Sequence, residues 1–259
     1  MRGQTDIVAA YRGLLEGSGY RGPDGAGPHV QDPYSLRCQP QVMGTCLDAM
    51  RFATDLLGRE LNAVTDNALI FADTGDILYG GNFHAQPVGL AADVLALALS
   101  EVGAMSERRI ALLTDANMSG LLPFLAAESG LNSGFMVAHV TAAALASENK
   151  ALANPRSTDS LPTTANLEDC VSMATHAARR LTEMAGIVAI ELLASCQGAH
   201  LRRPLRSSPA LEDVVEQVHG VAPPFDEDRF FALSIEAAKF LIVEGRFRAL
   251  VPPEILPAG

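Results

Sequence analysis

The stretch Val88-Gly89-Leu90-Ala91-Ala92-Asp93-Val94-Leu95-Ala96-Leu97-Ala98-Leu99-Ser100-Glu101-Val102-Gly103-Ala104-Met105 decides the fold class of this 259-residue chain. It is apolar on nearly every side of a helix, and such a helix packs inside a bundle. It forms the middle of a helix predicted from about Pro87 to Leu113. Alanine is the commonest residue and aromatic residues make up only 5% of the chain, which favours closely packed helices over sheets. We expect an all-α fold, a long-helix bundle, with residues 1–259 in a single helical domain.

Further helices are predicted on both sides of this stretch. Apolar residues recur at three- and four-residue steps from Met43 to Leu61, and Pro40 suits the first position of that helix. Asp226 is the predicted cap of a final helix that runs to Phe240. Two more helices are expected at about Asn132 to Leu152 and about Asn166 to Cys196. Turn residues predict irregular segments at 62–86, with a short hairpin, and at 153–165.

Composition excludes several classes of protein. Hydrophobic residues make up 48% and charged residues 19% of the chain, which argues against intrinsic disorder. The net charge is −11, so the chain is a poor candidate for binding nucleic acid or an anionic membrane. The basic stretch Arg202-Arg203-Pro204-Leu205-Arg206 is interpreted as a solvated loop. We expect no nucleic-acid partner and no membrane partner.

Membrane spans, disulfides and metal sites are not expected either. Asp93, Glu101 and Glu191 interrupt the most apolar segments, so no transmembrane helix is predicted. The four cysteines have no C-x-x-C spacing and are interpreted as reduced, mostly buried thiols. The six histidines form no metal-binding pattern. These features are typical of a cytoplasmic protein without a metal.

The segment Gln31-Asp32-Pro33-Tyr34-Ser35-Leu36-Arg37-Cys38-Gln39-Pro40-Gln41 carries the most specific chemical signal. Asp32 is the predicted cap and Pro33 the first residue of a short helical turn, which the second proline ends. Tyr34 and Arg37 then share one face of the turn. A guanidinium binds a carboxylate through two parallel hydrogen bonds, and a neighbouring phenol can move a proton. On spacing alone, a surface arginine beside a half-buried tyrosine is the alternative interpretation.

This segment resembles the Q-D-x-Y-S-x-R-x-x-P-Q signature of the aromatic amino-acid ammonia-lyases, and is most similar to that of the histidine-specific members. The similarity covers essentially the whole chain and corresponds to the C-terminal half of the family. The other matching segments are Gly80-Gly81-Asn82-Phe83-His84, Ser106-Glu107-Arg108-Arg109, Ala143-Ala144-Leu145-Ala146-Ser147-Glu148-Asn149-Lys150 and Asp159-Ser160-Leu161-Pro162-Thr163.

The resemblance implies deamination of L-histidine to trans-urocanate and ammonia, the first step of histidine catabolism. The family uses an electrophilic methylidene-imidazolone that forms when an internal Ala-Ser-Gly cyclises. The resemblance also implies a mainly helical homotetramer around a central bundle of the fumarase and aspartase type. The active sites of such a tetramer are assembled from more than one subunit.

The resemblance also implies roles for individual residues. Arg37 matches the arginine that holds the substrate carboxylate, Tyr34 the catalytic tyrosine beside the electrophile, and Gln31 a glutamine of the same pocket. Phe83 matches the aromatic wall near the substrate ring, for which a plain core aromatic is the alternative. Glu168 matches the catalytic carboxylate that faces the imidazole or the amine. This role is chemically reasonable because a buried imidazole N–H needs a hydrogen-bond acceptor. The alternative for Glu168 is a helix first turn, where an acid is favourable in any case.

The sequence departs from the family pattern at several places. No Ala-Ser-Gly occurs in the chain, and cyclisation needs the glycine because its amide must approach a carbonyl closely. We therefore expect the N-terminal, electrophile-bearing half to be absent and the chain alone to be inactive. Leu167 stands where the family has glutamine, and Cys170 where it has histidine. The chain is also about four residues shorter than the family between Met184 and Ile187, a shift of about 6 Å along a helix.

Three interpretations remain open. The chain is the C-terminal fragment of a lyase that needs an N-terminal half, or a non-catalytic assembly or regulatory partner of an intact lyase, or a helical scaffold without activity. In each of the first two, its partners are lyase chains in a homo- or hetero-oligomer. The long apolar helix from Val88 would leave an exposed hydrophobic face in a monomer, which predicts association.

Overall fold

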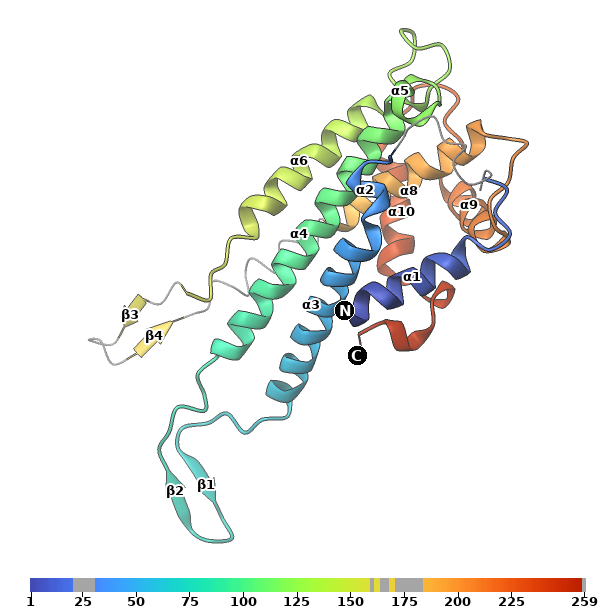
Figure 1. Ribbon diagram of the computed structural model, residues 1–259. Helices are drawn as coiled ribbons and strands as arrows, with labels where there is room; N and C mark the ends of the chain where they lie inside the picture. The colour runs from blue at the N-terminus through green and yellow to red at the C-terminus, as the bar shows by residue number, and fades with distance from the viewer. Residues whose placement is uncertain (21–30, 159–160, 164–167, 171–183, 258–259) are drawn as a thin grey trace.

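Three long helices form the frame of the molecule. In the computed structural model, which describes all residues except 21–30, 159–160, 164–167, 171–183 and 258–259, α3 (Gln39–Leu61), α4 (Gln86–Thr114) and α6 (Met136–Leu152) lie side by side (Figure 1). The helix α8 (Met184–Leu201) packs against α4 and α6. The prediction of an all-α, long-helix bundle is confirmed.

The predicted central helix α4 packs against neighbours on several sides. Ala91, Ala96 and Ile110 are fully or almost fully buried. Gly103 lets α8 approach, because a Cβ at this position would lie 3.1 Å from the side chain of Ile187. Leu97 remains 49% exposed. The helix is therefore a core element that keeps an apolar strip open to solvent, as its sequence predicts.

A second part of the core gathers around α8. The helices α9 (Pro209–Val221) and α10 (Ala232–Val243) pack against it. The rings of Phe135, Phe225 and Phe231 meet edge to face, with centroids 4.8 to 5.7 Å apart. The buried Gln197 donates to the carbonyl of Phe225 at 3.0 Å and accepts its N–H at 2.8 Å. This amide fixes the connection between α9 and α10 against α8.

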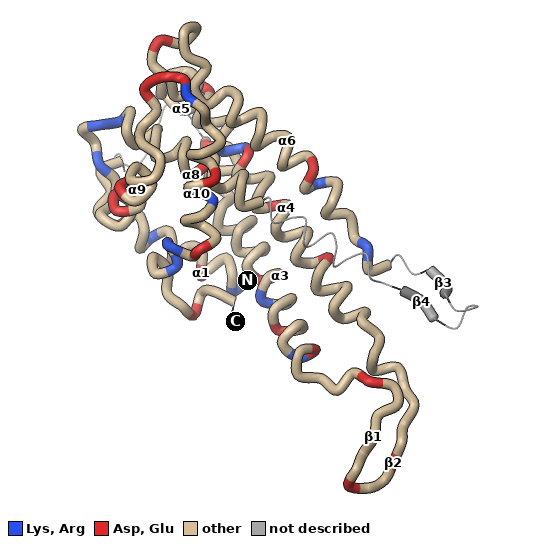
Figure 2. The backbone as a smooth tube through the Cα atoms, turned by 180° about the vertical axis from the view of Figure 1, so that it is seen from behind, with Lys and Arg blue, Asp and Glu red and all other residues tan. Residues whose placement is uncertain are grey.

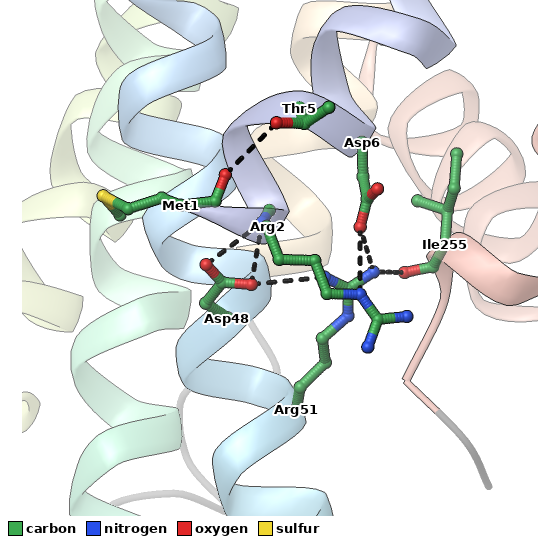
Figure 3. Close-up of polar contacts among 8 residues, drawn as sticks. Met1, Arg2, Thr5, Asp6, Asp48, Arg51 and Ile255 are labelled. Atoms are coloured by element: carbon green, nitrogen blue, oxygen red, sulfur yellow. Dashed lines mark hydrogen bonds and ion pairs between the residues drawn. The ribbon is translucent and has the colours of Figure 1, made fainter.

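The first helix, α1 (Arg2–Leu14), crosses α3 at two glycines. A Cβ at Gly44 would lie 2.6 Å from the Cα of Gln4, so the backbones touch directly. Asp48 of α3 accepts the N–H of Gly3 at 2.9 and 3.1 Å. Arg51 donates to Asp6 at 2.7 Å and to the carbonyl of Ile255 at 2.6 Å (Figure 3). The network ties both ends of the described chain to α3.

Short elements connect the helices. The strands β1 (Leu69–Phe71) and β2 (Asp76–Leu78) pair antiparallel, with Leu69 opposite Leu78, and project away from the bundle (Figure 1). The hairpin predicted within 62–86 is thus confirmed. The remaining short elements are α2 (Tyr34–Arg37), α5 (Ala116–Ser119), η1 (Pro123–Leu125), β3 (Leu161–Thr163), β4 (Glu168–Cys170), η4 (Arg248–Leu250) and η5 (Pro253–Ile255).

The helix predicted to run from Asn166 is wrong at its start. Glu168–Cys170 is a strand paired with Leu161–Thr163, so this stretch is extended. The pairing with Leu161–Thr163 takes up backbone groups of Glu168–Cys170 that a helix would bond internally. Helix is described again only from Met184. Asn166 itself and residues 171–183 lie outside the described residues.

Two further predicted helix starts are also wrong. The cap of α10 is Phe231, without a side-chain cap bond, and not Asp226. The neighbouring Asp228 accepts the N–H groups of the distant Ser133 and Gly134 at 2.8 and 2.9 Å, which holds this stretch out of the helix. Helix α6 begins four residues later than Asn132 because Gly134 has φ +54°, a left-handed conformation that a helix does not continue.

Charged residues are sparse along the long helices (Figure 2). By length and composition, α4 and α8 would each be able to cross a membrane, although about half of the relevant window, 50% and 56%, is buried inside the bundle. Core helices of globular proteins pass the same test, so this is weak support for a membrane span.

In the basic stretch at residues 202–206, Arg203 pairs with Glu212 at 2.8 Å and Arg202 donates to the carbonyl of Ser119 at 3.0 Å.

Candidate active site

Tyr34 and Arg37 lie on the outer face of the one-turn helix α2. The guanidinium carbon of Arg37 lies 4.5 Å from the centroid of the Tyr34 ring. Both side chains are exposed, Tyr34 by 68%, whereas Ser35 on the inner face is buried. The prediction that the two residues share one face is confirmed. The alternative of a half-buried tyrosine is wrong, because this phenol faces solvent.

The turn rests on a chain of hydrogen bonds beneath it. Gln39 donates from Nε2 to the carbonyl of Ser35 and accepts the hydroxyl of Tyr11 at 3.2 Å. Burial raises the pKa of Tyr11 above its ordinary value, against the opposing charge of Arg109. The phenol therefore stays protonated at neutral pH and donates to Gln39. This arrangement fixes the backbone that presents Tyr34 and Arg37.

The start of the turn differs from the prediction. Pro33 is the cap of α2 and makes no side-chain cap bond, so Asp32 does not cap the helix. The proline fixes the extended backbone that enters the turn, with φ −57° and ψ 156°. Gln31 is exposed and precedes the turn by three residues. It lies three residues before Tyr34 along the chain.

A partly buried ion pair that sequence reasoning missed lies between α4 and α8, behind α2. Arg109 donates from Nη2 to Glu191 at 2.8 Å, and the hydroxyl of Ser106 donates to the same carboxylate at 2.6 Å. The hydrogen bond and charge of Glu191 outweigh burial and raise the pKa of Arg109. Both residues line a cavity with Leu36 of α2. The Ser106-Glu107-Arg108-Arg109 motif contains two of the three residues, Ser106 and Arg109. Their partner Glu191 lies more than eighty positions away in the sequence, so no local pattern indicates the pair.

Phe83 lies far from Tyr34 within one chain. It follows the β1–β2 hairpin, is 48% exposed, and lines an open groove with Leu57 and Leu61 at the end of α3. Tyr34 precedes the opposite end of α3, a 23-residue helix about 35 Å long. The structure therefore does not bring these two candidates together in a single chain. The alternative of a buried core aromatic does not hold either, given this exposure.

Glu168 belongs to β4, where its backbone pairs with Thr163. Its side chain, like Leu167, lies outside what the structure describes. The alternative that Glu168 sits in the first turn of a helix is wrong, because the residue is in a strand. The following Cys170 pairs with Leu161 in the same ladder.

The described thiols and acids do not form a metal centre. Among the described residues, no group of three or more His, Cys, Asp or Glu side chains is placed to hold an ion. Cys46 and Cys196 are buried free thiols, and Cys38 is a partly exposed one. Burial raises the pKa of Cys46 to about 11 and that of Cys196 to about 12. These two thiols are unreactive at neutral pH.

Residues 1–220 match the family model described as aromatic amino acid lyase. The chain belongs to this family. Among curated relatives, the histidine ammonia-lyase of Rhodospirillum rubrum is 60% identical over 265 residues, which cover 99% of this chain and 51% of that protein. The chain thus spans about half the length of the curated relatives it matches.

Solved structures of lyase-family members share the fold. The crystal structure of histidine ammonia-lyase from Trypanosoma cruzi superposes with a TM-score of 0.87 at 40% identity, over 98% of this chain and 49% of that one. Tyrosine aminomutase from Streptomyces globisporus gives a TM-score of 0.87 at 33% identity, over 96% of this chain and 52% of that one. The bundle described above is the bundle of the aromatic amino acid lyases.

The tripeptide Ala-Ser-Gly does not occur in this sequence. The methylidene-imidazolone needs an Ala-Ser-Gly, and here Ala146-Ser147 and Ala194-Ser195 are followed by Glu148 and Cys196. A glycine is needed third because its amide must approach a carbonyl without a Cβ in the way.

Proposed function

We propose that this chain is one part of a histidine ammonia-lyase, which converts L-histidine to trans-urocanate and ammonia. The observation that carries the proposal is the exposed Tyr34 and Arg37 pair, 4.5 Å apart on a turn held rigidly from below. The 60% identity to a histidine ammonia-lyase supports the choice of substrate. The electrophile must come from a polypeptide segment that carries Ala-Ser-Gly.

Arg37 binds the carboxylate of the amino acid. Its guanidinium presents paired N–H groups that match the two carboxylate oxygens, which fixes the orientation of the substrate. Tyr34 lies beside this point, and its phenol accepts or donates a proton next to the bound amino acid. Gln31 adds an amide at the entrance of the turn. The pair is exposed in this chain, so a second surface must cover it to exclude water.

Phe83 and Glu168 complete the pocket from other copies or other chains. Phe83 packs on the substrate ring, and Glu168 accepts the N–H of the imidazole. The distance of about 35 Å along α3 supports this division, because one chain does not bring Phe83 to its own Tyr34. The exposed apolar residues of the hairpin, among them Ile70 (74%) and Tyr79 (82%), suit insertion into a neighbouring subunit.

The assembled enzyme is an oligomer of lyase chains in the cytoplasm, in which residues 1–259 act as one helical unit. Its small-molecule partner is L-histidine, and it takes no metal. The chain contributes the carboxylate-binding and proton-handling side of the site. The segment that carries the electrophile contributes the other side.

Co-expression with an Ala-Ser-Gly-bearing N-terminal half of a lyase tests the proposal. We expect the complex to form urocanate from L-histidine and to release no ammonia from L-phenylalanine. A stable complex that forms no urocanate would make the chain a non-catalytic assembly partner. Failure to associate at all would leave a helical scaffold without activity.

A further inference from the structure

Asp93 is a buried carboxylate of α4 that the proposed chemistry does not use. The residue is only 3% exposed and faces the segment that follows α6. Its Oδ1 accepts the backbone N–H of Arg156 at 2.9 Å, and its Oδ2 accepts the N–H of Arg156 at 2.8 Å and of Ser157 at 2.7 Å. Buried carboxylates persist where their oxygens are satisfied, and two successive backbone N–H groups do this here.

Gln86 holds the same segment from the first turn of α4. Its Nε2 donates to the carbonyl of Ser157 at 3.1 Å. Gln86 and Asp93 are seven residues apart, which is about two helical turns, so they share one face of α4. The N–H and the carbonyl of Ser157 are thus both bound by α4 side chains, and the residue is 6% exposed. We call this arrangement the α4 clamp.

The α4 clamp lies just before the hairpin that carries Glu168. Strand β3 begins at Leu161, four residues after Ser157. It pairs with β4 so that Thr163 lies opposite Glu168. Four residues of extended chain span at most about 14 Å. The clamp therefore limits where the hairpin can start relative to α4.

We propose that Asp93 is a positioning residue, which sets the location of Glu168 by anchoring the backbone of Arg156 and Ser157. This inference rests on the proposed function, in which Glu168 contacts the imidazole. A carboxylate suits this anchoring because both of its oxygens face N–H donors and its charge strengthens each hydrogen bond. Asparagine has the same shape but turns an NH₂ group toward one of these donors.

Amide hydrogen exchange on the chain itself tests the anchoring. In Asp93→Asn we expect the amides of Arg156 and Ser157 to exchange about tenfold faster or more, because their acceptor loses its charge and an NH₂ group replaces one of its two oxygens. The matched control is Asp55→Asn, a 63% exposed carboxylate on α3 that pairs with Arg59. It should leave both amides unchanged. Equal protection in wild type and Asp93→Asn would overturn the inference.

A double-mutant cycle tests whether Asp93 acts through Glu168. In the complex with an electrophile-bearing half, Asp93→Asn should lower kcat/KM for L-histidine by about 10- to 100-fold. In a Glu168→Gln background, the same change should lower kcat/KM only slightly further. A further loss of about 10- to 100-fold in kcat/KM in that background would overturn the positioning role.

A milder variant and a separate readout keep the two proposals distinguishable. If Asp93→Asn does not fold, Gln86→Ala removes only the bond to the Ser157 carbonyl and should show a smaller loss with the same dependence on Glu168. A wild-type complex without urocanate formation would overturn the proposed function and the positioning role with it. The exchange of the Arg156 and Ser157 amides would still decide whether the α4 clamp exists.

Discussion

At the residue scale, the geometry of Arg37 makes its charge alone insufficient. Lysine keeps the positive charge but presents no planar pair of N–H groups to a carboxylate. In the active complex, Arg37→Lys should lower kcat/KM for L-histidine by about 10- to 100-fold, the range for losing a hydrogen bond between charged groups. Steady-state urocanate formation measures this loss.

The control for this change is Arg59→Lys. Arg59 is 74% exposed and pairs with Asp55 one turn away on α3, so the substitution should leave kcat/KM unchanged. Equal activity of wild type and Arg37→Lys would show that Arg37 does not hold the substrate carboxylate.

In the proposed site, Tyr34 lies next to the bound substrate, and its role there depends on the hydroxyl. Tyr34→Phe keeps the ring over which Arg37 stacks and removes only the proton-carrying group. We expect kcat to fall by about 10²- to 10⁴-fold, as for other general acid–base residues, while KM changes little. Tyr79→Phe is the control, because it removes a hydroxyl from the hairpin and keeps the apolar ring there, 82% exposed. A normal kcat in Tyr34→Phe would remove this residue from the chemistry.

Glu107 gives the stability of the fold a dependence on acidic pH. Burial of this carboxyl opposes its charge, but hydrogen bonds from Arg108 and His139, the latter at 3.0 Å, outweigh it and lower its pKa. A carboxylate with a lowered folded-state pKa stabilises the fold above its unfolded pKa, and this stabilisation is lost as pH falls through the folded pKa. Below about pH 5, wild type should therefore lose Tm progressively.

The variant Glu107→Gln isolates this effect. Its Tm should be lower than that of wild type at pH 7 and should fall less steeply between about pH 5 and pH 3. Glu101→Gln, at an exposed position of the same helix, should follow the wild-type slope. Thermal unfolding followed by circular dichroism across this pH range measures all three. Parallel slopes for wild type and Glu107→Gln would contradict the role of this carboxylate.

At the element scale, two glycines of α3 predict opposite effects of the same substitution. A Cβ at Gly44 would collide with the backbone of α1 at Gln4, whereas a Cβ at Gly58 has nothing within 4 Å. Gly44→Ala should destabilise the fold by about 1–3 kcal/mol through overpacking. Gly58→Ala should stabilise it by up to about 1 kcal/mol through helix propensity. Urea unfolding gives both values, and a stabilised Gly44→Ala would mean that α1 does not cross α3 at this point.

Helices that bury a continuous apolar stretch could be predicted from the sequence, and those decided by distant contacts could not. The middle of α4 is a continuous apolar stretch, which predicts the helix from the sequence alone. Its predicted ends at Pro87 and Leu113 differ from the observed bounds, Gln86–Thr114, by one residue each. The start of α10 was wrong because Asp228 binds backbone groups near Gly134, nearly a hundred residues away. No local pattern reports such a contact.

Helix α9 was missed although its signal is local. Ser208 accepts the N–H of Leu211 at 3.3 Å and Pro209 occupies the first helical position. This Ser-Pro pair is an ordinary helix start. The adjacent basic stretch was predicted to be a solvated loop, yet its Arg203 pairs with Glu212 in the first turn of α9.

The candidate site also combines features that could be predicted from the sequence with features that depend on distant contacts. The spacing of Tyr34 and Arg37 predicted their shared face, because the interaction lies within one turn. The separation of Phe83 from Tyr34 depends on the observed bounds of α3, because Tyr34 precedes this 23-residue helix and Phe83 follows it. Asp93 was equally inaccessible, because its partners Arg156 and Ser157 lie more than sixty positions away.

At the scale of the whole molecule, the chain exposes apolar side chains that an assembly would cover. Leu97 on α4 and Val140 on α6 are 49% and 63% exposed, and Phe240 on α10 is 64% exposed. Exposed apolar surfaces of this kind mark interaction sites. In the proposed assembly, further lyase chains would cover these residues together with the exposed Tyr34 and Arg37.

The most direct test of the account is to titrate the purified chain into a purified, Ala-Ser-Gly-bearing N-terminal half and to follow urocanate absorbance with L-histidine. We predict that neither component is active alone and that activity rises with added chain until the two are equimolar. The Arg37→Lys chain should associate equally well and give much lower activity. Urocanate formation by this chain alone, or by the N-terminal half without it, would contradict a site shared between the two.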